Sequence, residues 1–153
     1  MLPGAGNGPR LAARALILIG GRLLLVNAYP GGQSDLWCAP GGGVDRHASI
    51  PDNLTREVAE ETGLSITVGQ LALVNEFHDP AADFHQVELF FYCAVVAGTL
   101  DPAWTDPEGV VNRHRLVTSG DLATLRHKPD SLAAVAWSRP GPPLYDPLER
   151  LVR

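Results

Sequence analysis

Residues 40–64, PGGGVDRHASIPDNLTREVAEETGL, constrain this chain more than any other stretch. Three consecutive glycines at residues 41–43 follow a short apolar run, and without Cβ atoms they let the backbone approach a ligand closely. Ser49 is typical of a helix start and Gly63 of a helix end. We therefore expect a glycine loop followed by a helix over residues 50–62.

Three glutamates, Glu57, Glu60 and Glu61, share one face of this predicted helix. At 3.6 residues per turn they fall within a sector of roughly 100°. Carboxylates held this close repel one another, and hard divalent cations such as Mg²⁺ bind carboxylate and phosphate oxygens. The pattern indicates metal-dependent phosphate chemistry, with a solvated acidic helix face as the alternative interpretation.

The rest of the chain consists mainly of strand-like segments on either side of this helix. Strands are expected at residues 11–19, 22–28, 36–39, 65–77, 84–96 and 110–118, with Gly20-Gly21 as a hairpin turn. Short helices are expected at residues 121–126, capped by Ser119, and at residues 129–137, before a proline-rich irregular segment at 138–153. This order predicts an α/β fold, a mixed sheet covered by helices. Residues 1–10 are expected to be a flexible lead-in to a single domain of residues 11–153.

Composition excludes several classes of protein. Hydrophobic residues make up 45% of the 153 residues, and the net charge is -5, so the chain has no basic footprint for long nucleic acid. The longest apolar run is broken by Gly-Gly-Arg, and no secretory signal is visible. Cys38 and Cys93 lie in apolar runs and are expected to be buried thiols. We expect a cytoplasmic protein with no membrane span.

The segment from Gly42 to Leu64 resembles the signature box of the Nudix (MutT-like) hydrolases, G-x5-E-x7-R-E-U-x-E-E-x-G-U, where U is aliphatic. The matching positions are Gly42, Arg56, Glu57, Val58, Glu60, Glu61, Gly63 and Leu64. The resemblance implies a Nudix-type α/β/α sandwich, with the box helix and the C-terminal helices packed on the sheet. It also implies a pyrophosphohydrolase that cleaves the diphosphate of a nucleoside diphosphate linked to a group X. Such substrates include ADP-ribose or another ADP-sugar, a dinucleotide and a modified nucleoside triphosphate.

The resemblance assigns roles by position. The catalytic residues would be Arg56, Glu57, Glu60 and Glu61. Mg²⁺ or Mn²⁺ would be held by Glu57 and Glu61, by Glu60 as a further ligand or base, by the Gly41 carbonyl, and by a carboxylate outside the box, first Glu108 and second Glu88. Substrate contacts are expected from Gly41, Gly42 and Gly43. His85 is a candidate base or ribose contact, with an ordinary polar histidine as the alternative.

One position of the box departs from the pattern. The first glutamate falls on Ala48, and the glycine that usually precedes it falls on His47. In the family that glutamate commonly pairs with the box arginine, so Arg56 needs another partner, with candidates Asp52, Glu60 and Asp45. The departure supports an alternative function, a non-catalytic Nudix-fold module that binds a nucleotide. Either function implies a small nucleotide ligand, and a homodimer is possible in this family.

Overall fold

The computed structural model describes residues 8–138 and 141–153, so most of the predicted lead-in lies outside the described residues. The helices are α1 (Ile50–Thr62), α2 (Ser119–Thr124), α3 (Leu132–Ala136) and the short 3-10 helix η1 (Pro80–Ala82). The strands are β1 (Arg10–Ile19), β2 (Arg22–Asn27), β3 (Trp37–Cys38), β4 (Gly41–Gly43), β5 (Ser65–Asp79), β6 (Phe84–Ala97), β7 (His114–Val117), β8 (Leu144–Tyr145) and β9 (Glu149–Arg150). Strand β1 therefore begins inside the segment predicted to be a lead-in.

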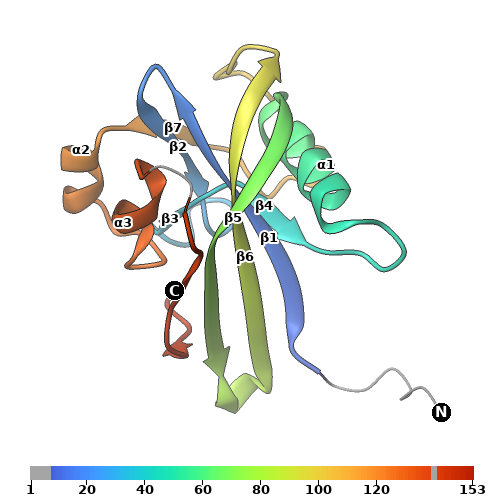
Figure 1. The fold of residues 1–153 in the computed structure, drawn as a ribbon, viewed down its shortest axis with the longest axis vertical. Coiled ribbons are helices and arrows are strands. Elements are labelled where there is room, and N and C mark those ends of the chain that lie inside the picture. The colour runs from blue at the N-terminus through green and yellow to red at the C-terminus, as the bar shows by residue number, and fades with distance from the viewer. Residues whose placement is uncertain (1–7, 139–140) are drawn as a thin grey trace.

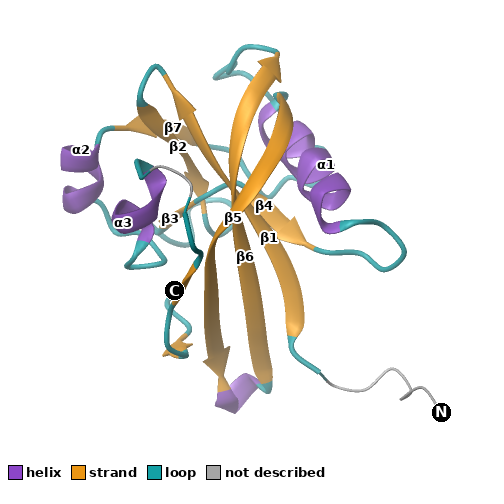
Figure 2. Ribbon diagram, viewed as in Figure 1, coloured by secondary structure: helices purple, strands orange, loops and turns teal. Residues whose placement is uncertain are grey.

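The strands form one mixed sheet, as predicted (Figures 1 and 2). Its central order is β3-β2-β1-β6-β5-β8, with β4 paired to β1, β7 to β2 and β9 to β5. Strands β1 and β6 run parallel, whereas β5 and β6 form a long antiparallel hairpin. The parallel β1–β6 pair brings the start of the chain beside residues more than seventy positions away.

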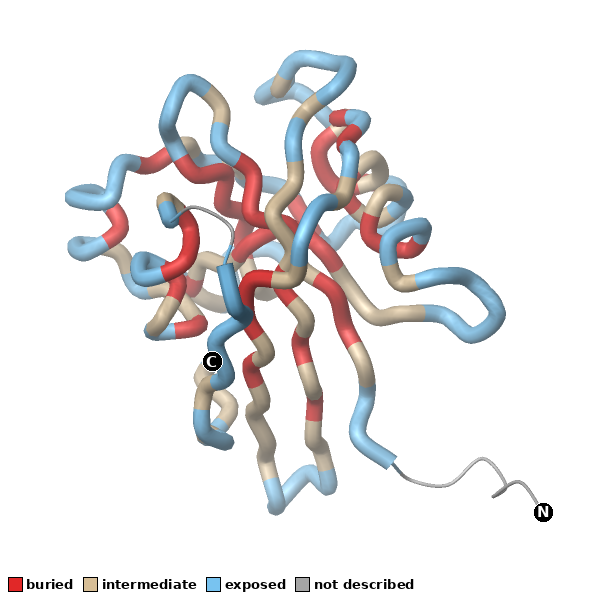
Figure 3. The backbone as a smooth tube through the Cα atoms, in the orientation of Figure 1, coloured by how far each residue is buried: buried red, intermediate tan, exposed pale blue. Residues whose placement is uncertain are grey.

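Two cores lie on opposite faces of the sheet. Figure 3 shows in red the buried stretches of the strands and helices that supply them. Ala15 and Ile17 of β1 pack with Leu54 and Val58 of α1, while Leu16 faces the core that contains the buried residues of α2 and α3. Each fully buried aliphatic side chain contributes about 1.5–3 kcal/mol. Because β1 supplies both cores through alternate residues, the predicted α/β/α sandwich is confirmed.

Helix α1 begins and ends where the sequence indicated. The Ser49 hydroxyl accepts a hydrogen bond from the Asp52 amide at 3.1 Å, which caps the first turn. Gly63 ends the helix at φ 74, and a Cβ at this position would lie 2.8 Å from the ring of Trp104. Only glycine satisfies both the left-handed backbone and the packing of the indole.

Three local predictions need correction. The glycine loop is strand β4, in which Gly41, Gly42 and Gly43 pair with residues 12–14 of β1. Helix α2 is capped by Thr118 and not by Ser119, because Thr118 and Asp121 exchange the two bonds of a capping box. The segment predicted to be irregular contains β8 and β9, which pair with β5 in parallel.

Two further predictions concern the cysteines and the membrane. Cys38 and Cys93 are free thiols as predicted, but each is half-buried and not fully buried. This partial burial raises the pKa of each to about 12, so both stay protonated near neutral pH. Among the described residues, the structure contains no helix with the length and apolar character needed to span a bilayer.

Candidate active site

Strand β4 lies directly against helix α1, and its glycines make this approach possible. At Gly41, φ is 151, and a Cβ there would overlap the Ala13 carbonyl oxygen. A Cβ at Gly42 would lie 2.8 Å from the Glu57 carboxylate. The Gly41 amide donates to the Glu61 side chain at 3.1 Å. The glycine run therefore places backbone directly beside two glutamates of the helix.

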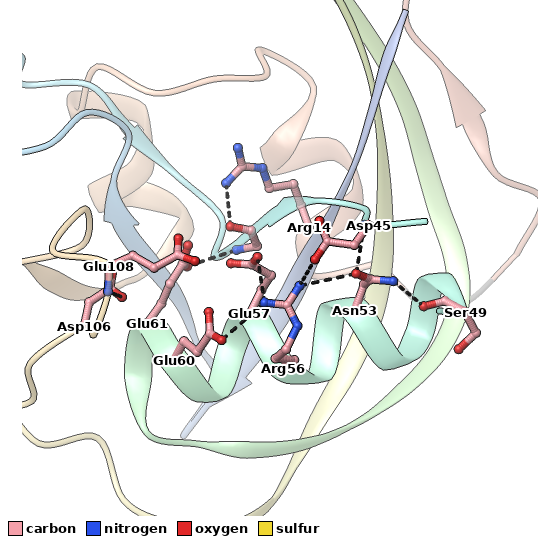
Figure 4. A network of polar contacts seen from close by, with 11 residues as sticks. Arg14, Asp45, Ser49, Asn53, Arg56, Glu57, Glu60, Glu61, Asp106 and Glu108 are labelled. Carbon is pink, nitrogen blue, oxygen red and sulfur yellow. Dashed lines mark hydrogen bonds and ion pairs between the residues drawn. The ribbon is translucent and has the colours of Figure 1, made fainter. Parts of the chain in front are cut away.

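Three carboxylates converge at the exposed edge of this contact (Figure 4). One oxygen from each of Glu57, Glu60 and Glu108 lies within 4.8 Å of the others. The Glu60 Oε2 atom is buried and has no hydrogen-bond partner among the described residues. A buried carboxylate oxygen without a donor is costly, so the cluster suits a cation. Hard divalent ions match this set of oxygen donors.

Glu61 lies deeper than the other acids, with 7% of its surface exposed. Burial raises the pKa of Glu61 to about 8, against the opposing effects of Arg14 and of the Gly41 amide. Glu61 lines a cavity of about 190 Å³ together with Glu57, Glu108 and the glycines of β4. The structure thus brings Glu61 and Gly41 to the compartment that contains the acid cluster.

The loop before β7 presents Glu108 to helix α1. The buried Asp106 carboxylate accepts hydrogen bonds from the amides of Glu108, Val110 and Val111 at 2.9–3.2 Å. Asn27, which is also buried, accepts from the amides of Asn112 and Arg113 at 3.0 Å. These bonds hold residues 110–113 as a fixed loop, so the strand predicted at 110–118 is reduced to β7.

The end of helix α1 is tied to the same loop region at two points. The Trp104 indole N–H donates to the Glu60 carbonyl oxygen at 2.8 Å. The His114 Nε2 atom donates to the Glu61 carbonyl oxygen, also at 2.8 Å. Both bonds satisfy backbone carbonyls in the last turn of the helix, which lack intrahelical partners. The loop that carries Glu108 is therefore held at a fixed distance from the box glutamates.

Arg56 has found replacement partners for the missing box glutamate. Its guanidinium lies 2.9 Å from Asp45, 3.2 Å from Glu60 and 3.4 Å from Glu57. It also donates to the Asn53 side chain at 3.3 Å. Two of the three predicted partners, Asp45 and Glu60, accept hydrogen bonds from Arg56. The third, Asp52, contributes instead to the helix cap, where its backbone amide donates to Ser49. Arg56 thus bridges two of the clustered acids and the preceding loop.

Glu88 and Arg14 form a separate pair. Arg14 Nε lies 2.7 Å from Glu88, and Gln86 donates to the same carboxylate oxygen at 3.1 Å. Arg14 also donates to the carbonyl oxygens of Ala39 and Gly41. The structure therefore groups Glu108 with the box glutamates and leaves Glu88 as the ion-pair partner of the half-buried Arg14.

A second cavity of about 370 Å³ lies beside the first. Its lining includes Tyr29, Phe77, Phe84 and the chain segment 149–153, with Gln86 and Glu88 from β6. His85 points to the opposite face of β6 from Gln86, next to His78, where the ring centroids are 6.1 Å apart. The structure does not bring His85 to either of these two cavities.

The sequence analysis missed several residues of the site: Arg10, Asn27, Trp104, Asp106 and His114. The DPEG turn at residues 106–109 is a signal that could have marked Asp106, since aspartate before proline favours a turn. The others act through contacts that join distant parts of the chain.

The chain belongs to the Nudix family, because the model of the NUDIX domain matches residues 8–138. An ADP-ribose pyrophosphatase from Streptococcus suis is 23% identical over 91% of this chain and 100% of that one, with a TM-score of 0.66. A NUDIX hydrolase from Nitrosomonas europaea is 24% identical over 80% of this chain and 82% of that one, with a TM-score of 0.67.

A UDP-X diphosphatase is also similar, with 22% identity over 76% of this chain and a TM-score of 0.62. This chain covers 54% of that protein, so it spans about half the length of the UDP-X diphosphatase. At these identities the three structures establish a shared fold. The substrate has to be argued from the site.

Proposed function

We propose that this protein is a divalent-metal-dependent hydrolase that cleaves the diphosphate linkage of a nucleoside diphosphate joined to a group X. The observation that carries the proposal is the convergence of Glu57, Glu60 and Glu108 within 4.8 Å, with one buried Glu60 oxygen lacking a donor in the described part of the chain. Family membership supports hydrolysis of pyrophosphate bonds. ADP-ribose or another nucleoside diphosphate sugar, a dinucleotide and a modified nucleoside triphosphate are the candidate substrates.

The residues present fit Mg²⁺ or Mn²⁺. Glu57, Glu60 and Glu108 would each supply an oxygen, and Glu61 and the Gly41 carbonyl would supply further ligands from the side of β4. When bound, the cation supplies positive charge to the diphosphate oxygens as the bond breaks. This charge also compensates a compartment that otherwise repels an anionic substrate.

Other residues of the chain position these ligands. Arg56 contacts both Glu57 and Glu60, so it holds two carboxylates in place and acts as a positioning residue. Asp106 fixes the loop that carries Glu108. The larger cavity is of the size that suits a nucleoside, and its aromatic side chains offer flat apolar surfaces to a base.

The alternative function, a non-catalytic nucleotide-binding module, rests mainly on Ala48. The loss of the glutamate at position 48 argues against catalysis only if it leaves Arg56 without a partner. Arg56 instead donates hydrogen bonds to Asp45 and Asn53. The contacts of Arg56 therefore favour the hydrolase over the binding module. Location in the cytoplasm, a homodimer and a single domain over residues 11–153 stay predictions.

Incubation with ADP-ribose, UDP-glucose, NADH and nucleoside triphosphates tests the proposal, with Mg²⁺ or Mn²⁺ and with chelator. We expect chelator-sensitive release of a nucleoside monophosphate from one of these classes. Glu57→Gln should lower turnover by about 100-fold or more, since partners that only orient metal ligands already cost 10–100-fold. Glu76→Gln, at a glutamate outside both cavities, is the matched control. A fully active Glu57→Gln variant would remove the metal assignment.

A further inference from the structure

The two neighbouring cavities have opposite charge. The smaller one is lined by four acids, Glu57, Glu61, Asp106 and Glu108, and by two arginines. The larger one is lined by five cations, Arg10, Arg14, Lys128, Arg150 and Arg153, and by two glutamates, Glu88 and Glu149. Arg10 and Arg14 line both cavities, so they stand where the two meet. An elongated anion that spans the cavities must pass these two arginines.

Of the two, Arg14 is already fully engaged and Arg10 is not. Arg14 is largely buried and is held by Glu88 and by two carbonyl oxygens. Arg10 donates to the neutral Gln86 side chain at 3.0 Å, and no carboxylate of the described residues lies within 4.0 Å of it. Residues 1–7 and 139–140 contain no acidic residue, so none of them can supply the missing charge. Arg10 is a cation held in place without an anion.

The position of the Arg10 guanidinium depends on Gly43. A Cβ at Gly43 would lie 2.5 Å from Arg10 Nη2 and 3.1 Å from its Cζ, so the guanidinium occupies the space that a side chain would fill. The next residue along the strand, Gly42, abuts the Glu57 carboxylate in the same way. Because successive residues of a strand face opposite sides, the arginine and the acid cluster flank the glycine strand, and both line the smaller cavity.

We propose that Arg10 is a substrate-binding residue whose guanidinium holds a substrate phosphate at the junction of the two cavities. The inference rests on the proposed function, in which the acid cluster handles the diphosphate through a cation. A guanidinium offers paired N–H donors that match phosphate oxygens, and this one stays available because Gln86 orients it without neutralising it. Gly43 is then needed at its position to leave room for Arg10.

The test uses the variants Arg10→Ala, Gly43→Ala and their combination. Binding of ADP is measured by calorimetry with Mg²⁺, which offsets the repulsion from the acids, and again in chelator. The constants kcat and KM are measured with Mg²⁺ on ADP-ribose and UDP-glucose. Arg10→Ala should weaken ADP binding and raise KM about tenfold, with kcat little changed, as expected for an interaction made equally in the ground and transition states. Gly43→Ala should cause a similar loss by displacing the guanidinium. In the Arg10→Ala background it should add almost nothing.

Arg22→Ala and Gly120→Ala are matched controls at residues that line neither cavity, and they should leave all parameters unchanged. Unchanged ADP affinity in Arg10→Ala would overturn the inference. So would a loss of ADP affinity from Gly43→Ala that is as large in the Arg10→Ala variant as in the wild type. Wild-type protein that does not bind ADP would overturn it too. Failure of the proposed function gives a different result: no substrate is cleaved, yet ADP binding still depends on Arg10, and the assignment of Arg10 stands.

Discussion

Replacing Glu61 with glutamine is expected to remove much of the pH dependence of stability when no divalent cation is present. Burial raises the pKa of Glu61 from 4.5 to about 8, although Arg14 and the Gly41 amide oppose the change. Between these values the native protein keeps a proton that the unfolded chain has lost. The contribution of this carboxyl is therefore complete below about pH 4.5 and is lost as the pH rises through about 8. At about 1.4 kcal/mol per pH unit, the interval corresponds to at most about 5 kcal/mol.

Urea unfolding in chelator at pH 5 to 9 measures the effect. Glutamine keeps an acceptor for the Gly41 amide and carries no charge, so Glu61→Gln should match the wild type near pH 5 and exceed it in stability at pH 8. Mg²⁺ should close the gap at pH 8 by stabilising the ionised Glu61. Glu76→Gln controls for the loss of a carboxylate elsewhere. Parallel stability curves for wild type and Glu61→Gln would refute the reasoning.

Three further predictions follow from the box and its loop. His47 has a φ of 70, a left-handed backbone conformation that glycine adopts without strain. After allowing for the greater flexibility of glycine in the unfolded chain, His47→Gly should stabilise the fold by about 0.5–1 kcal/mol and raise Tm by about 2–3 °C. A lower Tm would contradict this prediction. Asp45→Ala should lower the free energy of unfolding in urea by about 0.2–1 kcal/mol, a small loss because the ion pair between Asp45 and Arg56 is exposed. Ala48→Glu should recover this loss in the Asp45→Ala variant and add no stability to the wild type. Equal gains from Ala48→Glu in both proteins would argue against the replacement of the missing glutamate by Asp45. Gly42→Ala should push the Glu57 carboxylate aside. Turnover and Mg²⁺ affinity should each fall about tenfold or more, with little change in Tm. Unimpaired Mg²⁺ binding, measured by calorimetry, would count against the packing argument.

Features encoded by neighbouring residues could be predicted from the sequence. Helix α1 was predicted with its observed bounds, because Ser49 and Gly63 act on the backbone within a few residues of themselves. The β1–β2 hairpin followed from Gly20-Gly21, which both adopt positive φ. The placement of Glu57, Glu60 and Glu61 on one side of the helix followed from its period alone.

Features that depend on pairing between distant segments could not be predicted in this way. The glycine run forms strand β4 only because β1 offers it an edge, and nothing in the letters GGG indicates a strand. The sequence ranked Glu108 ahead of Glu88 as the outer carboxylate but could not exclude Glu88, and it is the ion pair with Arg14 that separates Glu88 from the cluster. Arg10 was assigned to a flexible lead-in because residues 1–10 are rich in glycine and proline. Its partner, Gln86, lies 76 residues away, where no local pattern reveals the contact.

Ala48 shows how a departure from a family pattern has to be judged by geometry. The sequence offered Asp45, Glu60 and Asp52 as partners for Arg56, and all three lay within reach along the chain. The choice was made by Asn53, whose side chain accepts from the Asp45 amide at 3.0 Å and from Arg56 at 3.3 Å. One amide thus fixes the loop and the arginine together, and Asp45 meets the guanidinium as a result. The function of the missing glutamate, holding Arg56 against the acid cluster, is retained by residues on either side of the position that lost it.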